Sequence, residues 1–377
     1  MGPMNIGCDS RALVGPKTGV GIWTEQIMGG LAESEINRVF LAASKVVSFD
    51  SVEETDNLCV VPPPRWPTLG PVWLNTTVPR LARELQLDIW IGSLAILPWS
   101  SPVPTVAMVH DLTPRTHPQL HTAANRTVFR LFLKRSLKTA NRVVAGSKAT
   151  RDEILSAFPW AESKLVRIGY GVDEWYSPAP TGDDGEGTRE RFAGGRPYVL
   201  HLGTIEPRKG IIDLVQAWER LNEGRAEGPD LVIAGKTGWH TEPILDRIKA
   251  SPLAPRIHLA GYVSRDDARD LLRHAAVFAL ASEAEGFGLP LAEAVSCGTP
   301  AVASDIPVLE EAGGDAAIYC PANHPDALAA GLVEALDPVV ATRLRERARK
   351  RAPELRWGPV VQAWVELLEH VWESRRA

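Results

Sequence analysis

Two glutamates, Glu285 and Glu293, stand eight positions apart with a glycine-containing turn between them. The apolar run 277–281 precedes this stretch, and Pro290 stands where a helix would begin. A buried strand that ends in a Gly-rich turn and feeds a helix directs backbone N–H groups toward an anion. Proline suits the first helical turn because no N–H is needed there. We therefore expect Glu285 on the loop and Glu293 in the first turn, addressing different parts of a phosphorylated sugar. The spacing alone also fits a capped helix that carries two solvated acids.

A cationic segment follows the apolar run 198–202. It extends from Gly203 to Gly210 and opens a helix near Ile211. Within it Arg208 offers a planar fork and Lys209 a point charge for phosphate oxygens. The alternative is a charged helix start on a solvated face.

The chemistry of this segment follows from its charge. Cleavage of a sugar–diphosphate bond leaves negative charge on the departing group, and fixed cations would stabilise that charge. Asp183 and Asp184 lie in a turn-rich stretch, and no His, Cys or acidic cluster has metal-ligand spacing. The sequence therefore predicts a site that uses neither a metal nor another cofactor.

Two further candidate segments lie in the first half of the chain. His110 and Asp111 come directly after the apolar run 105–109, where a side chain faces the ligand crevice of a parallel sheet rather than its core. The segment from Gly15 to Gly21, which includes Gly19, follows the first apolar run. It lacks GxGxxG spacing, and an exposed loop explains it equally well.

Short apolar runs alternate with amphipathic stretches along most of the chain, which predicts an α/β fold with parallel sheets. At 377 residues the chain exceeds the ~100–200 residues usual for one domain. The predicted parts are a first doubly wound domain over 1–176, a linker over 177–197, a second such domain over 198–356 and a terminal helix over 357–377.

The composition is that of an ordinary globular protein, with 45% hydrophobic and 23% charged residues. A net charge of −5 gives no reason to expect a nucleic-acid partner. Four cysteines without CxxC spacing indicate reduced thiols. Neither a signal peptide nor an apolar run of about 18 residues is found, so we expect a cytoplasmic protein. A nicotinamide dehydrogenase is disfavoured because GxGxxG with a following ribose acid is missing.

Taken together, these motifs resemble the retaining family 4 glycosyltransferases, the glycosyl transferases group 1, and in particular their mannosyltransferases. The resemblance rests on the segments 285–293, 203–210 and 110–112 and extends over roughly residues 4 to 372. It implies the GT-B fold, in which two Rossmann-like doubly wound domains face a central cleft and the C-terminal helix crosses back to the first domain.

The resemblance also implies a role for each candidate residue. Many family members carry an arginine where this chain has Thr204, which leaves open whether the diphosphate is held less tightly here. The implied catalytic residues are His110, Glu285 and Asp111; the donor diphosphate and sugar ligands are Arg208, Lys209, Gly19, Gly21, Phe287, Gly288 and Leu289; and the ribose ligand is Glu293.

The implied activity is transfer of a hexose from a nucleotide diphosphate sugar to an acceptor hydroxyl, with retention of the anomeric configuration. GDP-mannose is the first choice of donor, with UDP-glucose and others open, and the acceptor is a glycan or glycolipid. A front-face displacement and a covalent intermediate both remain open, and no nucleophile is assigned. The alternatives are a sugar-nucleotide epimerase of the same fold and a non-catalytic nucleotide-sugar-binding protein.

The stretch 126–138 predicts a basic amphipathic helix. Apolar residues, Phe129 and Leu133 among them, share one face, and cations recur every four residues. We expect either peripheral contact with an anionic membrane at its inner face or an ordinary surface helix. The cations are Arg126, Arg130, Lys134 and Lys138.

Overall fold

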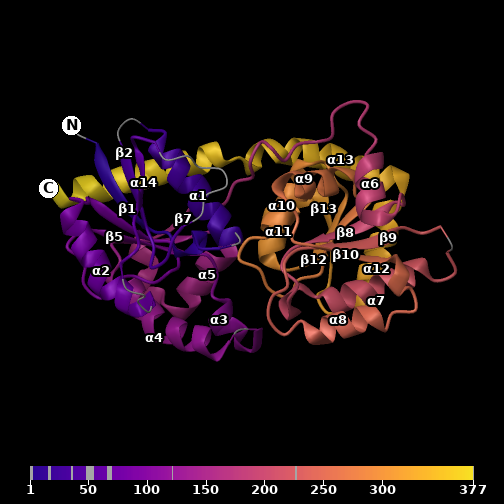
Figure 1. Cartoon of the computed structure of the whole chain (residues 1–377), viewed down its shortest axis with the longest axis horizontal. Helices are drawn as coiled ribbons and strands as arrows, with labels where there is room; N and C mark the ends of the chain where they lie inside the picture. Colours follow the sequence, from indigo (N-terminus) through magenta and orange to yellow (C-terminus); the bar gives the residue numbers. More distant parts are fainter. Residues whose placement is uncertain are drawn as a thin grey trace. The chain divides into compact units, whose positions relative to one another are not determined.

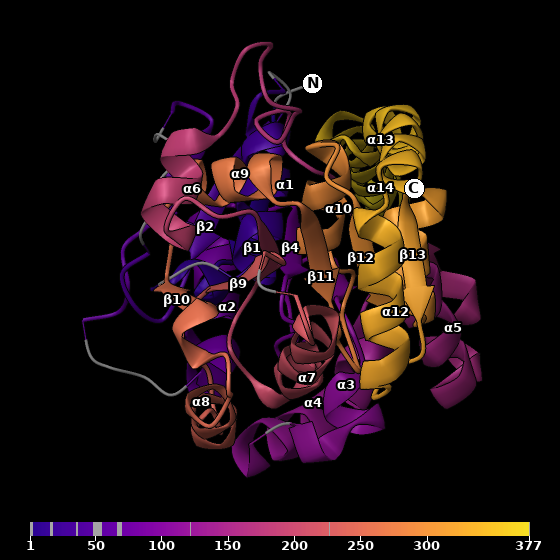
Figure 2. The ribbon, with the colours of Figure 1, turned by 90° about the vertical axis from the view of Figure 1, so that its right-hand side faces the viewer.

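The computed structural model describes residues 3–15, 18–34, 37–47, 55–65, 70–120, 122–225 and 227–376. The chain divides into two compact units. Unit 1 comprises Met1–Gly171 and Trp357–Ala377, and unit 2 comprises Val172–Arg356. Each is a parallel sheet with helices on both faces (Figure 1, Figure 2).

The sheet of unit 1 has seven strands in the order β3-β2-β1-β4-β5-β6-β7. All of its ladders are parallel, and the inner strands are apolar and buried because helices cover both faces. The strands are β1 (Met4–Asp9), β2 (Asn37–Ala42), β3 (Leu58–Val61), β4 (Ile89–Gly92), β5 (Thr105–Val109), β6 (Arg142–Ala145) and β7 (Leu165–Arg167).

The helices of unit 1 pack on this sheet in two groups. Helices α2, α4 and α5 share one hydrophobic cluster with the strands, whereas α1 contacts α14 (Figure 1). The terminal helix α14 thereby completes unit 1, and the rings of Trp23 and Trp364 pack edge to face with centroids 5.4 Å apart. The helices are α1 (Gly19–Ala32), α2 (Gly70–Glu84), α3 (Thr113–Thr116), α4 (Ala123–Thr139), α5 (Lys148–Ala157) and α14 (Trp357–Arg376).

The sheet of unit 2 has six parallel strands in the order β10-β9-β8-β11-β12-β13. In both units the strand order reverses at the first strand, as in the Rossmann fold, so ligands are expected at the carboxyl ends of β1 and β4 and of β8 and β11. The strands are β8 (Tyr198–Leu202), β9 (Asp230–Ala234), β10 (Ile257–Gly261), β11 (Val277–Leu280), β12 (Ala301–Ser304) and β13 (Ala317–Cys320).

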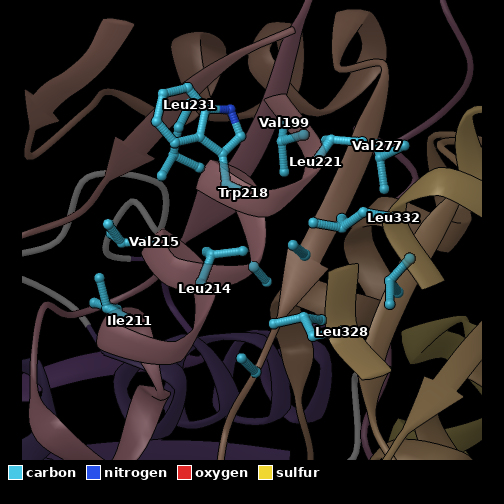
Figure 3. Packing of buried hydrophobic residues seen from close by; sticks show 14 of the residues in the cluster. Val199, Ile211, Leu214, Val215, Trp218, Leu221, Leu231, Val277, Leu328 and Leu332 are labelled. Atoms are coloured by element: carbon cyan, nitrogen blue, oxygen red, sulfur yellow. The ribbon is translucent and has the colours of Figure 1, made fainter. Parts of the chain in front are cut away.

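Helices α7, α8 and α12 lie on one face of the second sheet, and α6, α9 and α10 on the other (Figure 1). Figure 3 shows Leu214 and Trp218 of α7 packed toward Val199 of β8 and Leu332 of α12. The helices are α6 (Glu186–Ala193), α7 (Ile211–Asn222), α8 (Glu242–Lys249), α9 (Arg265–His274), α10 (Leu289–Ser296), α11 (Pro307–Gly313), α12 (Pro325–Leu336) and α13 (Pro338–Arg351).

The segment 177–197 differs from the predicted linker, because it contains α6 and belongs to unit 2. Its acids cap local structure: Asp183 accepts a hydrogen bond from the Gly185 N–H and lies 3.2 Å from the His274 imidazole. The turn-forming composition that suggests a linker therefore serves an ordered helix start. The change of unit falls between Gly171 and Val172, earlier than expected.

Candidate functional site

The connection between β8 and α7 carries the cationic segment of unit 2. A short 3-10 helix (Pro207–Lys209) follows β8 and ends at Gly210, which has a φ of 61°. A Cβ at Gly210 would lie 2.0 Å from the Ala281 carbonyl oxygen, so only glycine fits. The Glu283 N–H donates to the Arg208 carbonyl over 2.8 Å. The segments after β8 and β11 are thus held against each other by their backbones.

Glu285 lies in this contact and binds both cations of the segment. The Lys209 Nζ is 2.5 Å from Glu285 Oε1, and the Arg208 Nη1 is 2.9 Å from Oε2. The Ser282 hydroxyl donates to Oε1 over 2.7 Å. Glu206 forms a further ion pair with the Arg208 Nε. Two acidic and two basic side chains therefore form one largely buried cluster.

Burial and ion pairing shift the pKa values of this cluster in opposite directions. Burial alone would raise the pKa of Glu285, but the charges of Lys209 and Arg208 outweigh it and lower the pKa to about 2. Burial lowers the pKa of Lys209, and Glu285 opposes that shift. Burial raises the pKa of Glu206 against the nearby cations. Glu285 is therefore an anion at neutral pH, and a ligand phosphate must compete with it for Lys209 and Arg208.

The cluster brings together three of the predicted residues and adds two that the sequence reasoning missed. Arg208, Lys209 and Glu285 meet as expected of residues at one ligand site. Glu206 and Ser282 were not predicted. The sequence offered a reason to consider both residues, because Glu206 precedes Arg208 by two positions and Ser282 follows the end of an apolar run.

Glu293 has surroundings of its own. It is the fifth residue of α10 rather than a member of the first turn, because the helix already begins at Leu289. Burial raises the pKa of Glu293 to about 8, with Arg265 opposing and Asp173 adding to the shift. At neutral pH its carboxyl group is thus mostly protonated and can both donate and accept hydrogen bonds.

The turn between the two glutamates is fixed by packing. Phe287 and Leu289 are buried, and Gly288 has a φ of 92°. The Gly288 carbonyl accepts the N–H groups of Leu291 and Ala292 and so starts α10. A Cβ on Gly288 would meet the side chain of Leu309 in α11 at 2.4 Å. The geometry of this helix start depends on glycine.

His110 follows β5 in unit 1 and has both ring nitrogens engaged within that unit. Its Nε2 is 2.7 Å from the Ser93 carbonyl oxygen and its Nδ1 is 2.6 Å from the Tyr170 hydroxyl. Burial lowers the pKa of His110 to about 4, so the ring is neutral. A carbonyl oxygen can only accept, so Nε2 carries the proton and Tyr170 donates to Nδ1. The edge of Trp23 packs on the ring with centroids 5.1 Å apart.

The other candidate residues of unit 1 have local structural contacts. Asp111 Oδ1 accepts the N–H and the hydroxyl of Thr113, at 2.9 and 2.6 Å, and so caps the start of α3. Gly19 and Gly21 lie in the first turn of α1 and not on a loop before it. Pro16 and Lys17 of the same segment lie outside the described residues.

Within the ranges given above, no group of three or more His, Cys, Asp or Glu side chains is arranged to hold a metal ion. Over the same residues, no helix is both long and apolar enough to cross a bilayer.

The chain thus has two doubly wound sheets, and a cationic segment and acids follow β8 and β11 in the second of them. Residues 18–176 match Glycosyltransferase Family 4, and residues 187–354 match Glycosyl transferases group 1. The chain belongs to these glycosyltransferases, which confirms the resemblance seen in its motifs.

Relatives of this chain carry transferase names. O-antigen chain mannosyltransferase B of Escherichia coli is 31% identical over 232 residues, 61% of this chain and 61% of that protein. D-inositol 3-phosphate glycosyltransferase of Kineococcus radiotolerans is 30% identical over 260 residues, 64% of this chain and 60% of that protein. The matches therefore span about three fifths of these relatives' length.

Solved structures confirm the predicted GT-B fold. Sucrose-phosphate synthase from Thermosynechococcus elongatus superimposes with a TM-score of 0.79 at 19% identity, covering 99% of this chain and all of that one. Anabaena HepE in complex with UDP and glucose gives a TM-score of 0.78 at 19% identity, covering 97% of this chain and 99% of that one. At such identities the likeness concerns the fold alone.

Because Glu285 is held in ion pairs, we expect the free energy of unfolding to depend on pH. The folded-state pKa of Glu285 is depressed to about 2, so its contribution is present above its ordinary pKa of 4.5 and is lost as the pH falls toward 2. We expect Glu285→Gln to lower the free energy of unfolding by about 3 kcal/mol at pH 6, with the difference vanishing toward pH 2. Chemical denaturation across this pH range measures it.

The matched control is Asp326→Asn, which removes a carboxylate that is 88% exposed and pairs with Arg220. It should change stability by less than about 1 kcal/mol. A Glu285→Gln effect that is small and independent of pH would contradict the buried pairing.

The hydrogen bond from Tyr170 determines the tautomer of His110, and this can be tested. Removal of the phenol donor in Tyr170→Phe frees Nδ1 to take a proton, so the pKa of His110 should rise, while burial still keeps it below the ordinary histidine value. Histidine NMR measures this: wild type should show the Nε2–H form from pH 5 to 8. Tyr319→Phe, which removes a hydroxyl bonded elsewhere, should leave His110 unchanged. An Nδ1–H ring in wild type would disprove the assignment.

Proposed function

We propose that this chain transfers a hexose from a nucleotide diphosphate sugar to an acceptor hydroxyl, with retention of the anomeric configuration. The observation that carries the proposal is the cluster of Arg208, Lys209 and Glu285 after β8 and β11. It sets two fixed cations where ligands of doubly wound sheets bind. Its tightly packed backbone keeps them there without rearrangement during the reaction.

In the proposed complex the donor diphosphate replaces Glu285 as the partner of Lys209 and Arg208. Guanidinium and ammonium groups then face the oxygens that become negative as the sugar–phosphate bond breaks. Glu285, released from the ion pairs, can accept hydrogen bonds from sugar hydroxyls. The exchange keeps the buried cations paired before and after binding, which avoids the cost of an isolated buried charge.

The remaining site residues take supporting roles in this proposal. The protonated carboxyl of Glu293 donates to one ribose hydroxyl and accepts from the other. The N–H groups that start α10, near Phe287, Gly288 and Leu289, face donor oxygens. We assign His110 and Asp111, with Gly19 and Gly21 at the start of α1, to the reacting sugar and the diphosphate, on the resemblance to the family.

We propose that the reaction needs neither a divalent metal nor another cofactor, because Arg208 and Lys209 supply the fixed positive charge that a metal would otherwise provide. GDP-mannose is the proposed donor. The name of the Escherichia coli relative, a mannosyltransferase of O-antigen chains, supports that choice and a glycan or glycolipid acceptor.

Release of nucleoside diphosphate from a donor panel tests the activity. We expect slow hydrolysis of GDP-mannose, faster turnover with a glycan acceptor, and no loss of rate with chelator. Lys209→Met should lower the rate about 100-fold or more, as removal of one preorganised donor does. The matched control is Lys249→Met, which removes the ammonium group of a side chain that is 77% exposed and should leave the rate unchanged.

The products separate this activity from its alternatives. Conversion of a free nucleotide sugar without release of nucleoside diphosphate would indicate an epimerase. Binding of the nucleotide sugar without turnover would indicate a non-catalytic nucleotide-sugar-binding protein. Strict dependence on a divalent ion would contradict the assigned role of Arg208 and Lys209.

We also propose that α4 contacts an anionic membrane. Its cations are exposed and its sequence contains no acid. The side chain of Leu131 is 62% exposed, and the exposed ring of Trp99 stacks on Phe132 at 6.1 Å. Exposed apolar groups close to several exposed cations are typical of peripheral membrane contact.

Sedimentation with vesicles tests this contact. Binding to vesicles that contain phosphatidylglycerol should exceed binding to phosphatidylcholine vesicles, and 0.5 M salt should abolish the difference. Replacement of Leu131 by Glu should weaken the bound fraction more than replacement by Gln. Equal binding to both kinds of vesicle would contradict the proposal.

A further inference from the structure

A pocket of about 580 Å³ opens in unit 1 beside α3 and α4. The pocket belongs to unit 1, whereas the cluster around Glu285 belongs to unit 2, and neither His110 nor Asp111 is in the pocket wall. Its volume falls in the range of about 300–1,000 Å³ usual for small-molecule sites. Two residues of α3 line it, Pro114 and Arg115, which are three and four positions after Asp111.

The wall of the pocket is strongly cationic. Four of its eleven lining residues are basic and none is acidic, although the whole chain carries a net charge of −5. Within the part of the chain that the structure describes, none of the four forms an ion pair. The Arg126 Nη1 donates to the Pro118 carbonyl at 3.3 Å, and Arg115 lies over the Phe158 ring. The four cations are Arg115, Arg126, Arg130 and Lys134.

The rest of the pocket is apolar. Leu133 and Phe158 are buried, and Phe129 is half-buried beside them. Inorganic phosphate makes no favourable contact with such an apolar surface, whereas a hydrocarbon chain is stabilised by each CH₂ group that it removes from water there. Cations next to an apolar wall therefore match a phosphate joined to an alkyl chain.

We propose that this pocket binds one lipid molecule with a phosphate or diphosphate headgroup. The phosphate oxygens lie among the four basic side chains, and the first part of the alkyl chain lies against Phe129, Leu133 and Phe158. The inference deepens the proposed function in one respect and rests on it there: where the sugar acceptor is lipid-linked, the pocket holds the acceptor's phosphate.

Titration with short-chain phosphatidic acid below its micelle concentration tests the pocket without a membrane. We expect saturable one-to-one binding of dihexanoyl phosphatidate and none of dihexanoyl phosphatidylcholine. Dibutanoyl phosphatidate should bind at least about tenfold more weakly than the dihexanoyl form, because it buries fewer methylenes. Inorganic pyrophosphate should compete only weakly.

Two double variants of α4 each remove two positive charges. Arg130→Gln with Lys134→Gln removes two cations of the pocket, whereas Arg135→Gln with Lys138→Gln removes two outside it. The pocket pair should weaken phosphatidate binding more than about tenfold, through lost charge-assisted hydrogen bonds. The outer pair should stay within about threefold. Unchanged thermal unfolding and unchanged GDP-mannose hydrolysis establish that both double variants are intact at the other site.

Several results would overturn this assignment. Equal weakening in both double variants would indicate a diffuse electrostatic face. Affinities that do not depend on chain length, or pyrophosphate binding as tight as that of the lipid, would assign the pocket to free phosphates. Absence of saturable binding would remove the site altogether. Failure of donor hydrolysis with intact lipid binding would count only against the transferase.

Discussion

The ion pair between Lys209 and Glu285 is the constraint around which unit 2 is arranged. The two side chains are each only 6% exposed, and their charged atoms are 2.5 Å apart. A buried ion pair seldom stabilises a protein more than well-packed apolar residues would, because both charges lose their hydration. Its presence at the carboxyl ends of β8 and β11 therefore points to a ligand that uses these charges.

The backbone around the pair explains why it can be held so closely. Gly210 has a positive φ and lets the β8–α7 connection contact the Ala281 carbonyl, where any Cβ would collide. The first helical residue after it, Ile211, belongs to the same buried cluster as Leu214 and Trp218 (Figure 3). The position of Lys209 is thus fixed by the core of unit 2 on one side and by the strand end on the other.

Much of the fold could be predicted from the sequence, because apolar runs of strand length alternate with amphipathic stretches. The order of the strands could not, since it depends on pairing between distant segments. Turn-forming residues at 177–187 suggest a loop, yet Asp183 and Asp184 cap α6. Composition alone does not distinguish a free linker from a capped helix start, because the same residue types serve both.

The same limit on prediction from the sequence applies to the candidate site. Residue types and spacing were enough to bring Arg208, Lys209 and Glu285 to one place, since parallel strands end at one edge. They could not reveal that Asp111 caps α3 or that His110 is held by Tyr170 and Ser93. The two His110 contacts join residues distant in the chain, whereas the Asp111 contact is local, and each depends on which partner a buried polar group finds in the folded unit.

The neutral state of His110 restricts the chemistry open to it. A ring whose Nε2–H is donated to a carbonyl and whose Nδ1 accepts from a phenol has no lone pair left for a substrate proton. A role as general base would require one of these hydrogen bonds to break, which leaves a buried polar group unsatisfied at a cost of about 1–3 kcal/mol. In the role proposed for it, His110 would therefore help to shape the site of the sugar rather than transfer a proton. In the proposed reaction, Lys209 and Arg208 would therefore stabilise the negative charge that develops on the leaving diphosphate.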